Sequence, residues 1–131
     1  MELERDDLPA AERLLAIFTP LEAHDAVLRG CPFHNAAVEA AGALPGVAEV
    51  VKEHKKAFLA RIIATAREAG AADPHSLGRQ LAVLYEGANA LAASRNDNTV
   101  FADARRAAQL LIDAAISRTP TAKGALPTRR C

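Results

Sequence analysis

The chain has 131 residues, 31 of them alanine, and its 16 basic and 16 acidic side chains give a formal net charge of zero. This length predicts a single domain that can bury a core without disulfide or metal staples. The balanced charge, with no stripe of Lys and Arg interleaved with aromatics, excludes the usual nucleic-acid-binding surface. Abundant alanine predicts an all-α fold, an irregular antiparallel bundle of about five helices.

The first helix is expected to begin near Leu8, with Pro9 in its first turn. Thr19-Pro20 then bends the segment near Phe18, because a proline either kinks a helix or restarts it after an N-cap threonine. The apolar stripe of this segment consists of Leu14, Ile17, Phe18 and Leu21, and it resumes at Leu28.

Gly30 ends that segment, and Pro32 can open a short helix that runs to about Ala41. A long amphipathic helix is predicted from Val47 to Ala69, ended by Gly70. Its apolar stripe comprises Val47, Val51, Phe58, Ile62, Ala66 and Ala69.

Asp73-Pro74 has the pattern of an N-cap followed by an N1 proline, which predicts a helix to about Ser94. The polar link 95–98 then predicts an antiparallel last helix from Thr99 to Ser117. We expect one domain over residues 1–118 and a flexible polar tail over 119–131.

The helix segment from Leu81 to Ala93 is apolar nearly all round, so it has to be covered on two sides. A second copy is the simplest cover, and we expect a homodimer whose last two helices form a four-helix seam about a two-fold axis. The predicted interface residues are Leu81, Leu84, Ala88, Leu91, Phe101, Ala104, Ala108, Leu111 and Ala115.

Two pairs of residues carry candidate chemistry. Cys31 and His34 form a C-x-x-H pair, which suits half of a zinc site, a thiol nucleophile with its base, or a core cysteine beside a polar pocket residue. The first two interpretations lack further ligands or an orienting group, so no metal and no catalytic residue is expected. Tyr85 and Asn89 share a helix face, where they either contact a ligand or bond to each other.

No phosphate loop, serine-hydrolase, zincin or EF-hand pattern is present, so we expect neither an enzyme nor a cofactor. The two cysteines, Cys31 and Cys131, do not resemble a disulfide framework. The charged start has no apolar leader region, and no run approaches the roughly 18 apolar residues of a membrane span. A soluble cytoplasmic protein without membrane contact is the expectation.

The order of these motifs resembles the C-terminal regulatory domain of TetR-family transcriptional regulators, from about Pro9 to Ile116. The most specific marker is the string from Arg29 to Ala37, which reads Arg-Gly-Cys-Pro-Phe-His-Asn-Ala-Ala. The other markers, in order, are His54-Lys55-Lys56, Ala69-Gly70-Ala71, Asp73-Pro74, Arg79-Gln80-Leu81 and the run from Leu84 to Ala88.

The resemblance implies a homodimeric domain that binds a small effector and signals to an N-terminal helix-turn-helix, through which the whole regulator, a repressor in our interpretation, binds DNA. No such DNA-binding part precedes Met1, so the chain is interpreted either as one domain of a longer regulator, which we favour, or as a stand-alone remnant. An effector that is largely apolar is expected. Its predicted contacts are Phe18, Phe33, His34, Asn35, Phe58, Ile62, Tyr85 and Asn89.

Two other interpretations remain open from the sequence. The first is a helical dimer that acts as an interaction module without an effector. The second is a Cys31-dependent enzyme or metal protein.

Overall fold

The structure is a computed structural model that describes residues 2–19 and 45–116. These residues form four α-helices and a short 3-10 helix and contain no strand, which confirms the all-α prediction. The helix predicted over 32–41, the Cys31–His34 pair and the tail over 119–131 lie outside the described residues. The elements are η1 (Glu2–Glu4), α1 (Ala10–Ala16), α3 (Pro45–Glu68), α4 (Pro74–Arg95) and α5 (Thr99–Ile116).

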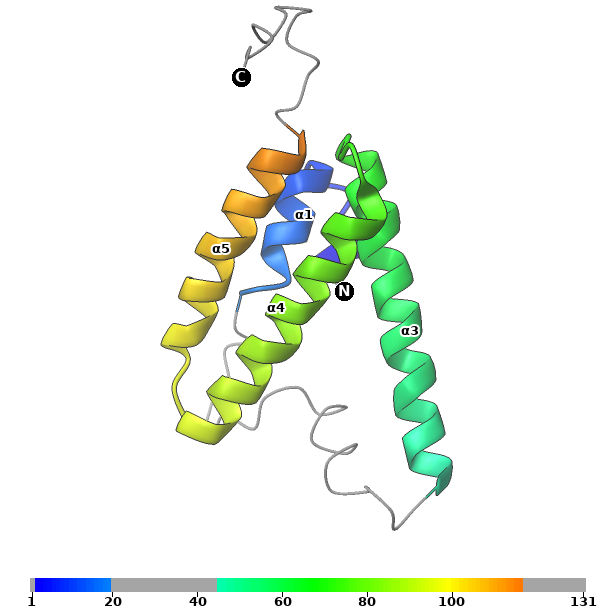
Figure 1. Ribbon diagram of the computed structural model, residues 1–131, viewed down its shortest axis with the longest axis vertical. Helices are drawn as coiled ribbons and strands as arrows, with labels where there is room; N and C mark the ends of the chain where they lie inside the picture. Colours follow the sequence, from blue (N-terminus) through cyan, green and yellow to red (C-terminus); the bar gives the residue numbers. More distant parts are fainter. Residues whose placement is uncertain (1, 20–44, 117–131) are drawn as a thin grey trace, which may run out of the picture.

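The three long helices run up, down and up, and the short α1 packs against both α3 and α5 (Figure 1). The helices α3 and α4 lie close together near the turn that joins them and separate toward their other ends (Figure 1). The helices α4 and α5 are antiparallel neighbours, as the short link at 96–98 predicts. The chain therefore makes two helical hairpins that share α4.

Local signals set the ends of these helices. Beyond the end of α3, Gly70 has a φ of 85°, the left-handed conformation that glycine adopts without strain. At the start of α4, the Asp73 side chain accepts a hydrogen bond from the Ser76 N–H at 3.0 Å, and Pro74 occupies the first turn. At the other end of α4, Asn96 takes the left-handed conformation, with a φ of 49°. The predicted caps around Asp73 are therefore confirmed.

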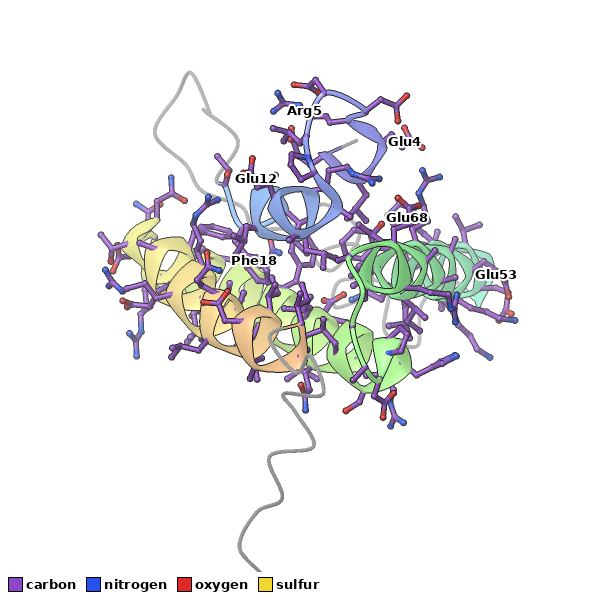
Figure 2. All side chains as sticks on the ribbon, turned by 90° about the horizontal axis from the view of Figure 1, so that it is seen from above. Glu4, Arg5, Glu12, Phe18, Glu53 and Glu68 are labelled. Atoms are coloured by element: carbon purple, nitrogen blue, oxygen red, sulfur yellow. The ribbon has the colours of Figure 1, made fainter. Side chains whose placement is uncertain are left out.

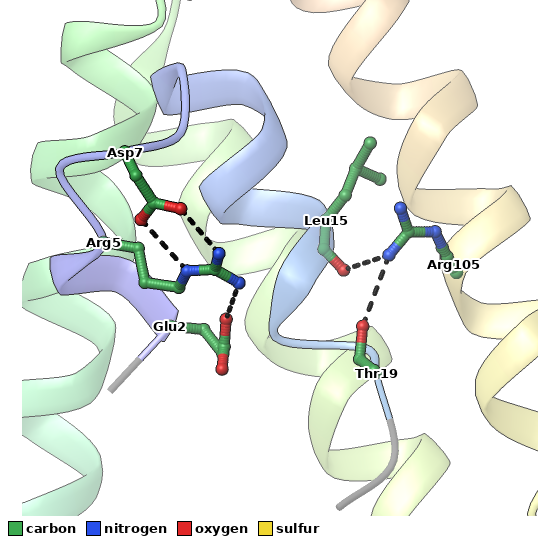
Figure 3. Close-up of polar contacts among 6 residues, drawn as sticks. All are labelled: Glu2, Arg5, Asp7, Leu15, Thr19 and Arg105. Atoms are coloured by element: carbon green, nitrogen blue, oxygen red, sulfur yellow. Dashed lines mark hydrogen bonds and ion pairs between the residues drawn. The ribbon is translucent and has the colours of Figure 1, made fainter.

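The first helix differs from its prediction at its start. It begins at Ala10, not near Leu8, because Pro9 has an extended backbone with a ψ of 151° and serves as the N-cap. It ends at Ala16, and Arg105 of α5 donates a hydrogen bond to the Leu15 carbonyl at this end, at 3.1 Å (Figure 3). Helix carbonyls at a C-terminus lack partners within the helix, so this arginine fixes α1 to α5.

The core lies where α1, α3, α4 and α5 meet, and Phe18 extends from the end of α1 toward α4 and α5 (Figure 2). Each of the four helical segments contributes apolar residues to it, in the i, i+3 or i+4 spacing that the sequence shows. The largest side chains that are almost completely buried are Leu14, Phe18, Ile62, Leu81 and Ile112.

The N-terminal segment is part of the fold, which the charge pattern did not indicate. Leu3 of η1 is 2% exposed and belongs to the core. The Arg13 guanidinium donates to the Leu3 carbonyl at 3.1 Å and pairs with Glu68 of α3, while Arg61 pairs with Glu4. On the outer side of the segment, Arg5 pairs with Asp7 and Glu2 (Figure 3).

Within residues 2–19 and 45–116, no other helix covers the side of the α4–α5 hairpin that points away from α1 and α3. Successive helix residues are about 100° apart, so Val83 and Leu110 point away from the buried Leu81 and Ala108. Their exposed fractions are 72% and 73%, and Leu91 is 43% exposed. We call the surface formed by Val83, Gly87, Leu91, Leu110 and Ala114 the outer face.

Candidate functional site

Three aromatic rings from three different segments of the chain meet. The Phe58 ring of α3 lies 4.8 Å from the Tyr85 ring of α4, measured between centroids, at an interplanar angle of 46°. The Phe18 ring, just after α1, lies 6.3 Å from the Tyr85 ring at an angle of 72°, close to an edge-to-face geometry. Such arrangements suit the charge distribution of aromatic rings. We call these three residues the aromatic cluster.

The rings of the aromatic cluster are not equally accessible. Phe18 is 1% exposed and Ile62, one turn after Phe58, is 0% exposed, so both belong to the core. Phe58 and Tyr85 are half-buried and pack against that core. The buried side of the cluster therefore consists of Phe18, with Ile62 of the core nearby. Its partly accessible side, the front, consists of Phe58 and Tyr85.

Asn89 lies one turn after Tyr85 on α4. It is 6% exposed, and its Nδ2 donates to the Tyr85 backbone carbonyl at 2.8 Å. The side chain thus bonds to the residue one turn earlier, as one of the sequence interpretations expected, but through the backbone.

One ion pair joins α3 to α4 next to the same rings. Lys55 Nζ lies 2.7 Å from Glu86 Oε2, and both side chains are 33% exposed. Lys55 is one turn before Phe58, and Glu86 directly follows Tyr85. Lys55 and Glu86 were not among the predicted ligand contacts. Their sequence positions, next to the predicted contacts Phe58 and Tyr85, could have indicated that they lie near the rings.

The predicted ligand contacts divide into two groups. Five of them, Phe18, Phe58, Ile62, Tyr85 and Asn89, come from three separate segments and surround one region of the described structure. The other three, Phe33, His34 and Asn35, lie outside the described residues. The contact of the first five with a ligand stays a prediction.

The predicted dimer residues lie at different depths within one chain. Five of them are buried in the core: Leu81, Ala88, Phe101, Ala104 and Ala108 are each at most 8% exposed. Leu84, Leu111 and Ala115 are half-buried, and Leu91 is exposed. The prediction did not include Val83 and Leu110, which have larger exposed fractions. Their exposure could have been predicted from sequence position, because each follows a core residue by two places and so lies on the opposite side of its helix.

Two hollows lined by described residues lie away from the aromatic cluster. One, of about 420 Å³, lies along the first turns of α4 between Asp73 and Val83. The other, of about 370 Å³, lies between η1, α1 and α3 and includes Arg13 and Thr65. Both are open and lined largely by charged or polar side chains, whereas small-molecule sites are mostly apolar. The aromatic cluster is the more apolar candidate site within the part of the chain that the structure describes.

The described residues contain no group of three His, Cys, Asp or Glu side chains that could hold a metal ion. None of the described helices combines the length and apolar character needed to cross a membrane.

The described residues form an all-helical domain in which apolar residues of several helices meet around the aromatic cluster. The family model of the tetracyclin repressor-like C-terminal domain matches residues 10–108. The protein therefore belongs to the TetR-type C-terminal domain family, whose members are regulatory domains for ligand binding and dimerisation and not a class of enzymes. No curated protein and no solved structure matches the chain.

Proposed function

We propose that this domain senses a small, largely apolar effector at the aromatic cluster and acts as the regulatory part of a repressor. The observation that carries the proposal is the meeting of Phe58 and Tyr85, half-buried and 4.8 Å apart, on two helices that separate away from the turn that joins them (Figure 1). An apolar ligand placed against these rings would bury further aromatic surface, which is the main source of affinity at such sites.

We assign the polar orientation of the effector to Asn89, whose side chain bonds to the Tyr85 backbone beside the rings. Its amide oxygen can accept a hydrogen bond from a ligand hydroxyl or amide. Three further residues complete the proposed contacts. Phe33 adds apolar surface, and His34 and Asn35 add polar groups that orient the ligand.

Dimerisation is assigned to the α4–α5 hairpin. The outer face exposes Val83, Leu91 and Leu110, three of the four large apolar side chains exposed among the described residues. Leu84 and Leu111, half-buried, lie at its edge. The predicted dimer residues that are buried in the core lie under this surface. In the proposed dimer, a second copy of the chain covers the outer face.

The two activities are linked through α4, which contributes to the aromatic cluster on one side and to the outer face on another. A ligand that binds one arrangement of α3 and α4 better than another shifts the population toward that arrangement. In the proposed regulator, the shift changes the separation of two helix-turn-helix units, one per copy, and thereby DNA affinity.

The test uses a built-in reporter. Tyr85 is the single tyrosine and there is no tryptophan, so the intrinsic emission of the protein comes from the candidate site. A panel of apolar metabolites is screened for a change in Tyr85 emission together with a rise in Tm. A ligand at 100 times its Kd adds about 2.7 kcal/mol to the free energy of unfolding.

The deciding variant is Phe58→Ala, with Phe101→Ala as its matched control, since both remove a phenyl ring but Phe101 lies at the start of α5. The proposal expects Phe58→Ala to lose the ligand response and Phe101→Ala to keep it while both lower the Tm. A broad panel without any response would instead favour a helical interaction module with no effector.

A further inference from the structure

The ion pair between Lys55 and Glu86 lies at the front of the aromatic cluster. Its 2.7 Å contact connects the two helices that carry Phe58 and Tyr85. With each side chain 33% exposed, the pair is partly shielded from water but still open to exchange with a solute. A ligand resting on the two rings would therefore have a charged group of the protein within reach.

The charge around this pair is asymmetric. Lys52, Lys55 and Lys56 follow one another at helical spacing along the edge of α3 that continues to Ile63, which contacts Gly78 of α4. The acidic Glu53 lies about 160° around the helix from Lys55, on the opposite side, and Glu49 and Glu53 are each one turn before Lys52 and Lys56. Of the three lysines, Lys55 is the one that pairs with Glu86, while Lys52 and Lys56 are exposed beside it.

We propose that the effector is an anionic amphiphile, with an apolar body on the Phe58 and Tyr85 rings and a carboxylate bound by Lys55 in place of Glu86. This inference rests on the proposed function and adds the chemical class of the ligand. An ammonium group donates to an incoming carboxylate as it does to Glu86, and the flanking Lys52 and Lys56 favour the anion at longer range. Glu86 keeps Lys55 in position while no ligand is bound.

The exchange at Lys55 has a mechanical consequence for the hairpin. The backbones of α3 and α4 approach closely near Ile63 and Gly78, where a Cβ atom added to the glycine would lie 3.2 Å from the Ile63 Cα. Lys55 and Glu86 are each eight residues away from that point, about 12 Å along their helices. When the ligand binds Lys55, the ion pair between α3 and α4 breaks. The contact between Ile63 and Gly78, nearer the turn, stays in place.

A cationic amphiphile bound by Glu86 is the competing class. The three lysines disfavour it, because a cation at Glu86 would meet Lys55 and be repelled by Lys52 and Lys56. The two classes are separated by ligands that share one apolar body and differ only in their polar end.

The experiment titrates the full chain with 4-phenylbutanoate, 4-phenylbutanamide and 4-phenylbutylamine, and with decanoate and 1-decanol as a second matched set, following Tyr85 emission and heat of binding. The acid is expected to bind roughly tenfold more tightly than its neutral partner, since it alone makes a charge-assisted hydrogen bond. Lys55→Met should bring that ratio close to one, and Glu86→Gln should tighten binding of the acids by releasing Lys55.

Lys52→Met is the charge-matched control, because it removes the same charge one turn away and should change the ratio much less. Equal affinities for acid and amide, or a ratio that Lys55→Met does not change, would overturn the anionic class while leaving the effector site in place. Preference for the amine would overturn it in favour of a cationic effector. If no probe binds, the inference of an anionic effector fails. If the metabolite panel also gives no response, the proposal of an effector site fails with it.

Discussion

Gly78 of α4 lies directly against Ile63 of α3. A Cβ atom added to Gly78 would come within 2.5 Å of Ile63 Cγ1 and 3.2 Å of the Ile63 backbone N and Cα. The glycine therefore permits the close approach of the two helices, and with it the distance between Phe58 and Tyr85 further along the hairpin.

Gly78→Ala is expected to destabilise the protein although alanine is the better helix former. The strain of the clash, typically about 1–3 kcal/mol, exceeds the roughly 1 kcal/mol gained in helix propensity. Urea unfolding monitored by circular dichroism measures the difference. An unchanged or raised free energy of unfolding would show that α3 and α4 can separate here without cost.

Gly87→Ala should have opposite effects on folding and on association. No atom lies within 4 Å of a Cβ added to Gly87, so the alanine should stabilise the folded chain by about 0.5–1 kcal/mol through helix propensity. If a second copy approaches the outer face closely at Gly87, the same methyl group weakens the dimer. Sedimentation equilibrium gives the dimer Kd, and a Kd that does not rise would place the crossing elsewhere.

Leu81→Ala and Leu110→Ala should differ in what they damage. Leu81 is 0% exposed, and its truncation should cost about 2–5 kcal/mol of unfolding free energy through the cavity it leaves. Leu110 is 73% exposed, so its truncation should change the stability of one chain by no more than about 0.5 kcal/mol. Leu110→Ala should instead raise the dimer Kd. Denaturation at low concentration, together with sedimentation, separates the two effects.

Asp97 should make stability depend on acidic pH. Its Oδ1 accepts hydrogen bonds from the backbone N–H of Thr99 at 2.9 Å and from the Thr99 hydroxyl at 2.7 Å. The backbone bond, and then the hydroxyl bond, hold the pKa of Asp97 below its ordinary value. A lowered folded pKa contributes stability above the unfolded pKa, about 3.9, and loses it as the pH falls through the folded pKa.

The measurement compares the Tm of the wild type with that of Asp97→Asn, which retains an acceptor oxygen but does not titrate. The wild type should be the more stable of the two at pH 7, and the difference should shrink as the pH falls below about 4. A difference that is constant across this range would assign the effect to packing of the side chain and not to its charge.

Several elements were predictable because their signals are local. Asp73-Pro74 predicted the start of α4, and the side chain of Asp73 indeed caps Ser76. Gly70 predicted the end of α3 and has the expected left-handed backbone. The start of α1 was predicted two residues too early, because a proline near a helix start suits both the first turn and the N-cap position.

The burial of Leu3 was not predictable in the same way. A short charged segment with one leucine resembles a solvent-exposed terminus, and only the packing of η1 against α1 and α3 shows where that leucine goes. The same holds for Lys55 and Glu86, which are 31 positions apart in the chain and meet because α3 and α4 form a hairpin.

The sequence by itself determined the helices, their caps, the family and the apolar side of each helix, because 3.6-residue periodicity and capping act over a few neighbouring residues. Only the tertiary structure decided which apolar residues cover one another and which stay open. Leu81 and Leu91 belong to the same apolar run of α4, yet one is 0% and the other 43% exposed. Periodicity identifies an apolar side but carries no information about its partner, which depends on how α3 and α5 pack on α4.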